Sequence, residues 1–145
     1  MARVSLKNSD SETNIPRFRF FCINTTLNDY RLCWALNETL NLNLTRIENI
    51  SINEMAMQTF SIFQDKETNP PIIFSLLSLK SEKGLLLKDL AGFDFVFCID
   101  GNIEFADLQL QISTIKNVLL ITRLENKKTK PSTITELNYL IEMIG

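Results

Sequence analysis

The segment FDFVFCIDG, residues 93–101, places the strongest constraint on what this chain can fold into. Its central run, FVFCI, is apolar at five consecutive positions, so a strand formed by it has no polar side. Such a strand is typical of a sheet that is covered on both faces. Asp100 and Gly101 follow as a turn-forming pair. The sequence therefore predicts a strand over residues 93–99 that is buried on both faces.

The other segments show either the pattern of a strand or the period of an amphipathic helix, in the order β-α-β-β-β-β-α-β-α. The first strand alternates apolar and polar residues, which predicts a half-buried strand, whereas the last, NVLLITRL, is expected to be buried. The turn-like connections DKETNPP and SEKG favour an antiparallel meander in the middle of the chain. The predicted strands are 17–24, 93–99, 117–124 and three that start near 44, 57 and 71; the predicted helices are 29–40, 103–116 and one that starts near 133.

These elements fit one domain. Residues 1–15 have no apolar periodicity, so we expect a flexible tail there. Residues 16–145 suffice for one hydrophobic core but not comfortably for two. We expect a single α+β domain with one mixed, mostly antiparallel sheet of five or six strands and helices packed chiefly on one face.

Composition excludes several classes of function. The chain has no histidine and no CxxC pair among its three cysteines, so we expect no metal site and no cofactor. We expect Cys22, Cys33 and Cys98 to be buried free thiols. Gly-rich phosphate loops and catalytic serine motifs are absent from the sequence. A net charge of −2 gives no reason to expect nucleic-acid binding. Without a secretory h-region or a long apolar run, we expect a cytoplasmic protein that does not enter membranes.

The stretch NDYRLCWALN, residues 28–37, contains the only tryptophan and begins a predicted helix with Asn28 as N-cap. Helical phase puts Leu32, Cys33 and Leu36 on the core side. A second face carries residue types that are enriched at binding surfaces. We identify this face as a candidate interaction surface, unless the third helix or a sheet edge covers it. Its residues are Tyr30, Arg31, Trp34 and Glu38.

Asp94 is unusual because it stands between two phenylalanines at the start of an apolar strand, where an unpaired carboxylate is costly. Either it lies at an exposed strand start, or a backbone N–H or a cation pairs with it. We favour a structural role, in which Asp94 holds a turn. The alternative is a ligand-binding site formed by Asp94, Asp100 and Asn102.

Three stretches, DYRLCWALN, LNLTRIENI and GLLLKDLAGFDFVFCIDG, resemble the IPExxxVDY family of bacterial proteins. The resemblance covers roughly residues 17–124. Where the family has Ile-Pro-Glu this chain has LKD at 87–89, and where it has Val-Asp-Tyr the chain has FDF at 93–95. The resemblance implies a structural motif at Asp89, Asp94 and Phe95, and a cytoplasmic location. The family has no assigned biochemical activity.

We therefore expect a small non-catalytic module for protein interaction or regulation, whose partner is another protein or a second copy of the chain. The alternative is a small-molecule-binding protein or an enzyme with a pocket near Asp94 and Asp100. A polar pocket around these two carboxylates would favour the second function, and a closed core there would favour the first.

Overall fold

The computed structural model describes residues 18–51, 59–81, 84–85, 90, 92–101, 105–124 and 135. The predicted tail and the predicted third helix lie outside the described residues, except that Thr135 is helical and exposed. No helix in the described part of the chain is long and apolar enough to cross a membrane.

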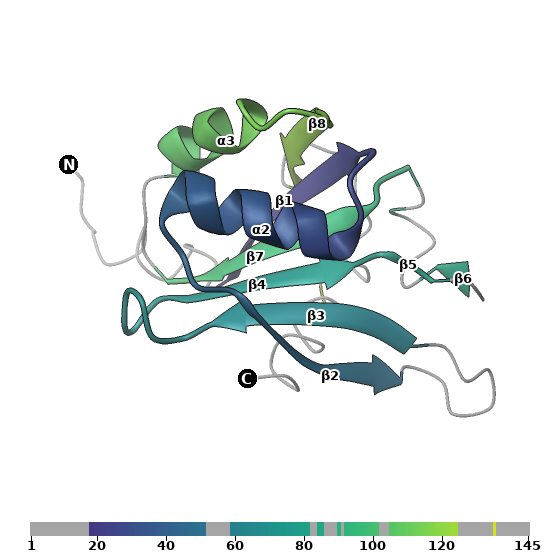
Figure 1. Cartoon of the computed structure of the whole chain (residues 1–145), viewed down its shortest axis with the longest axis horizontal. Coiled ribbons are helices and arrows are strands. Elements are labelled where there is room, and N and C mark those ends of the chain that lie inside the picture. The colour runs from purple at the N-terminus through teal and green to yellow at the C-terminus, as the bar shows by residue number, and fades with distance from the viewer. Residues whose placement is uncertain are drawn as a thin grey trace, which may run out of the picture.

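Six strands form one sheet in the order β2-β3-β4-β7-β1-β8 (Figure 1), and all their described pairings are antiparallel. The predicted α+β fold is therefore confirmed, and β2, β3 and β4 form the predicted meander. Two short strands, β5 and β6, make a separate antiparallel ribbon. The strands are β1 (Phe18–Thr25), β2 (Thr45–Ser51), β3 (Thr59–Asp65), β4 (Ile73–Ser78), β5 (Lys80–Ser81), β6 (Gly84–Leu85), β7 (Phe95–Asp100) and β8 (Val118–Arg123); the helices are α2 (Asp29–Leu40) and α3 (Phe105–Ser113).

Both helices are crossovers between parallel strands that are not neighbours. Antiparallel pairing at every step makes β1 parallel to β2, which α2 connects, and β7 parallel to β8, which α3 connects. The β1–α2–β2 connection runs toward one edge of the sheet and the β7–α3–β8 connection toward the other. β1 and β7 also point in opposite directions. Reversing both the strand direction and the direction of the crossover leaves the helix on the same face, so two crossovers of the same hand place α2 and α3 on one face. Figure 1 shows α2 and α3 on one side of the sheet, as predicted.

Both faces of the central strands are buried. On the helix face, Phe21 and Phe97 belong to a core cluster with the inner sides of α2 and α3. On the opposite face, Cys22 and Cys98 belong to a second cluster. Residues 95–99 of β7 are all buried, which confirms the prediction from the FVFCI run.

Two predictions about burial are wrong, and strand order explains both. β1 was predicted to be half-buried, but Phe21 and Ile23 are as fully buried as Cys22, because β1 lies between β7 and β8 with cover on each face. β8 was predicted to be buried, but Leu119 is 65% exposed and Leu120 53% exposed, because β8 is the edge strand. Apolar content alone does not distinguish an edge strand from an interior strand.

The ends of the helices follow from local chemistry. The side chain of Asn28 accepts a hydrogen bond from the backbone N–H of Arg31, and Asn41 ends α2 in the left-handed conformation, so α2 has the predicted bounds. α3 ends at Ser113 and not at the predicted residue 116. A turn over residues 114–117 follows, in which Asn117 has a φ of 74°.

A buried carboxylate joins the loop before β2 to the turn after β3. Asp65 accepts hydrogen bonds from the backbone N–H groups of Asn43 (2.8 Å), Glu67 (3.0 Å) and Thr68 (3.1 Å). Burial by itself raises the pKa of Asp65, but a side-chain hydrogen bond from Thr68 and these backbone bonds together lower it below its usual value.

Candidate functional site

The outer face of α2 is open to solvent. Tyr30 is 57% exposed and Trp34 is 66% exposed, while Arg31 and Glu38 are also exposed. The inner residues of α2 are buried in the core on the helix face. No strand of the described sheet covers Trp34, and the predicted third helix, the other possible cover for this face, lies outside the described residues.

Tyr30 differs from the other residues of this face because its side chain contacts the sheet. Arg46 donates a hydrogen bond from Nη1 to the hydroxyl of Tyr30 at 2.6 Å, and its guanidinium lies 5.5 Å from the centre of the Tyr30 ring. The ring also makes an edge-to-face contact with Phe63, with centroids 5.5 Å apart. Tyr30 thus anchors the first turn of α2 to β2 and β3.

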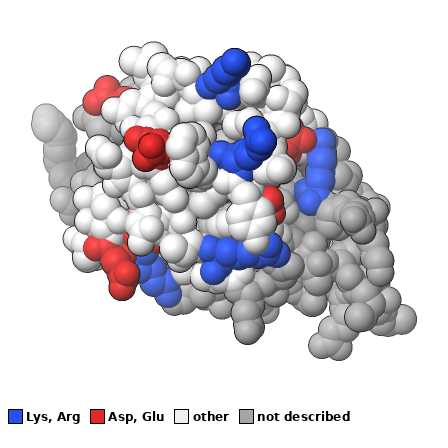
Figure 2. Space-filling view, viewed as in Figure 1, with Lys and Arg blue, Asp and Glu red and all other residues white. Residues whose placement is uncertain are grey.

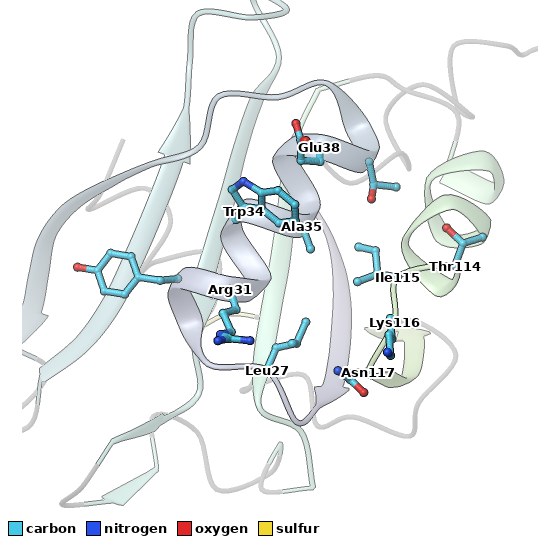
Figure 3. A pocket seen from close by; sticks show the side chains of 11 residues that line it. Leu27, Arg31, Trp34, Ala35, Glu38, Thr114, Ile115, Lys116 and Asn117 are labelled. Carbon is cyan, nitrogen blue, oxygen red and sulfur yellow. The ribbon is translucent and has the colours of Figure 1, made fainter.

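Trp34 borders a groove of about 610 Å³ between α2 and the turn after α3, which we call the α2–α3 groove (Figure 3). Its apolar floor is formed by Leu27, Ala35 and Ile115. The remaining lining residues are Tyr30, Arg31, Trp34, Glu38, Thr39, Thr114, Lys116 and Asn117.

The turn that forms one wall of the groove is fixed to the sheet. The carbonyl oxygen of Asn117 accepts hydrogen bonds from the hydroxyl of Thr25 at 2.6 Å and from the backbone N–H of Thr26 at 3.2 Å. Since α2 begins shortly after Thr26, both walls of the groove are tied to the end of β1. The sheet therefore holds both walls of the groove in place.

Charge is unevenly distributed along the groove. Arg31 and Lys116 lie toward one end, and Glu38 lies at the other end beyond Trp34 (Figure 3). In the described part of the chain, these three side chains have no hydrogen-bond or ion-pair partner. Figure 2 shows the same face with uncharged surface between separate acidic and basic side chains. The groove thus offers an apolar floor, an exposed indole and unpaired charges of both signs.

Asp94 lies outside the groove and connects β1, the end of β4 and strand β5. Its Oδ2 accepts a hydrogen bond from the backbone N–H of Thr25 at 2.9 Å, and its Oδ1 lies 3.0 Å from Nζ of Lys80. Its own backbone bonds to Ile23 and Leu79. Asp94 is therefore partnered by a backbone N–H and a cation, at the point where β1 changes register against β8.

The structure does not bring Asp94 and Asp100 together. Asp94 precedes β7 and Asp100 ends it, so about 20 Å of extended strand separates them at 3.3 Å per residue. Asn102 and Asp89 lie outside the described residues. Phe95 is buried and pairs with Ile23 and Ser78, which places it in the core.

The three thiols are free and buried, as predicted. Burial, aided by the charge of Asp29, raises the pKa of Cys33 to about 11, although a hydrogen bond from Asn37 opposes the shift. Burial and the charge of Asp100 raise the pKa of Cys98 further. In the described part of the chain, no three Cys, Asp or Glu side chains gather as a metal site would require.

Sequence reasoning found one wall of the groove and missed the other. Leu27 and the turn 114–117 were not singled out, because helix α3 was predicted to continue through residue 116. Asn117 was the available signal, since asparagine is one of the residues that ends helices in the left-handed conformation.

No protein-family model matches the chain, and no relative is found among curated proteins. The resemblance to the IPExxxVDY family therefore stays a prediction.

Proposed function

We propose that this protein is a non-catalytic interaction module that binds a polypeptide partner in the α2–α3 groove. The observation that supports this function is the 66% exposure of Trp34 beside an apolar floor. Burial of an indole exposed to this extent contributes about 3 kcal/mol to association. Exposed aromatic residues next to an arginine are also the residue types that dominate binding energy at protein interfaces.

The charges favour a polypeptide over a nucleic acid. A nucleic-acid surface would use cations along its whole length, whereas Glu38 would repel phosphate at one end of this groove. Proteins present charges of both signs near apolar side chains, which matches the arrangement of Arg31, Trp34 and Glu38.

The proposal includes a cytoplasmic location. Three free, buried cysteines suit a reducing compartment, where disulfides are rare. Membership in the bacterial IPExxxVDY family is part of the same proposal and rests on the motifs described above.

Site-specific crosslinking tests the function. A photoreactive p-benzoylphenylalanine at position 34 is compared in native cells with the same residue at position 110, because Leu110 is equally exposed, at 67%, but lies outside the groove. We expect a discrete crosslinked protein from position 34 that is absent from position 110. Crosslinks that are identical at the two positions, or absent from both, would contradict the proposed function.

A further inference from the structure

The groove side of α2 presents a narrow stripe with a symmetric pattern. Arg31, Trp34, Ala35 and Glu38 occupy positions i, i+3, i+4 and i+7, so they lie within about 100° of arc on the helix. All four line the α2–α3 groove. The stripe has a cation at one end, an anion at the other, and a large and a small apolar residue between them.

This pattern is complementary to itself. A twofold axis that passes between Trp34 and Ala35, perpendicular to α2, places a second α2 antiparallel to the first. Arg31 then faces Glu38 of the second copy, because the two residues are equidistant from the axis and differ by only about 20° around the helix. The two Trp34 side chains meet beside the axis, because the twofold keeps them on the same side of the interface. The Arg31–Glu38 contact occurs twice, as in any isologous interface.

We propose that the occupant of the groove is a second copy of this chain, bound through antiparallel pairing of the two α2 helices. This inference rests on the proposed function and names its partner. The two indoles, each 66% exposed in a single copy, cover one another at the centre of the interface. Each Glu38 meets the end of the other groove where Arg31 and Lys116 lie.

Charge complementarity favours this occupant over a polypeptide of a single charge sign. An acidic polypeptide would pair with Arg31 and Lys116 but would leave Glu38 opposed by like charge. A basic polypeptide would have the opposite defect. A second copy supplies an opposite charge at each end, and none of these three side chains has a competing partner in the described part of the chain.

Reciprocal charge reversal tests the proposal. We expect wild type to self-associate in sedimentation velocity, and we expect Arg31→Glu and Glu38→Arg each to weaken this at least about tenfold through repulsion of like charges. An equimolar mixture of the two variants is expected to form a heterodimer, since each supplies the charge that the other lacks. The double variant is expected to self-associate again. Glu67→Arg, an exposed reversal outside the groove, is the control and is expected to leave association unchanged.

Tryptophan fluorescence locates the interface in the same samples, because the chain has one tryptophan. We expect a blue shift of emission with rising wild-type concentration, and no shift for Arg31→Glu. Circular dichroism and melting curves show that each variant is folded. A wild type that stays monomeric up to about 1 mM, or a dimer that persists in both single variants, would overturn the proposal.

The two proposals fail separately. A monomeric wild type together with a crosslink from position 34 to a different protein would reject the second copy and retain the proposed function. Dimerisation without any change in Trp34 emission would show that the copies meet elsewhere, which also rejects the twofold pairing.

Discussion

The stability that Asp94 contributes can be divided between its two partners. Its carboxylate accepts a part-buried hydrogen bond from the backbone N–H of Thr25 and forms an ion pair with Lys80. The side chain of Lys80 is 45% exposed, whereas the hydrogen bond to Thr25 fixes the end of β1. We therefore predict that the backbone hydrogen bond contributes more than the ion pair.

Typical energies give the order of the effects. A hydrogen bond to a charged acceptor contributes about 2 kcal/mol, and an exposed ion pair less than about 1 kcal/mol. Asp94→Ala is expected to lower the free energy of unfolding by about 2 kcal/mol, and Lys80→Ala by about 0.5 kcal/mol. Asp94→Asn keeps an oxygen that can accept from Thr25, so it is expected to resemble Lys80→Ala.

Urea unfolding and calorimetry measure these differences. In a chain of this size, about 2 kcal/mol corresponds to a fall of roughly 6 °C in Tm. An unchanged Tm for Asp94→Ala would refute the structural role. Equal destabilisation by Asp94→Asn and Asp94→Ala would show that the charge, and not the backbone hydrogen bond, supplies the stability.

Three further predictions concern the core and the turns. The pKa of Asp65 is lowered by folding, so its contribution is present above pH 4 and is lost as the pH falls through the folded pKa. Asp65→Ala should cost about 2 kcal/mol, and its acid unfolding, followed by circular dichroism, should occur at a higher pH than that of wild type. Burial raises the pKa of Cys33 to about 11, so the stability that the neutral thiol contributes is intact below pH 9 and falls between pH 9 and 11. Urea titrations at each pH would detect this fall, and no loss of stability in that window would contradict the burial of the thiol. Gly101→Ala should destabilise the folded protein by about 2 kcal/mol, because φ at this position is +150° and the added Cβ would lie 2.8 Å from Cγ1 of Ile72. Gly92→Ala is the control, because a Cβ there meets nothing within 4 Å, and equal melting temperatures for the two variants would contradict the prediction.

Local signals in the sequence predicted the helix that carries the candidate site. Asn28 as N-cap and the period of Leu32, Cys33 and Leu36 depend only on residues within α2, so the bounds and the two faces of this helix could be predicted. The FVFCI run likewise contains its own evidence of burial on both faces.

Features that depend on distant parts of the chain could not be predicted. The groove needs Ile115 and Lys116 beside α2, which follows from the position of α3 in the sheet and not from any local pattern. The partners of Asp94 come from β1 and β5, and no sequence spacing indicates them. The exposure of Leu119 follows from the place of β8 at the edge of the sheet.

The position of β1 between β7 and β8 also sets the order in which this protein can be completed during synthesis. β1 is the first of the described strands to leave the ribosome, yet both strands that pair with it are made last. The β2-β3-β4 meander can form from neighbouring segments, while β1 must wait with its apolar side chains unprotected. A chain that stops before β7 therefore leaves a strand with no partner on either side, so premature termination should produce an aggregating fragment and not a smaller folded domain.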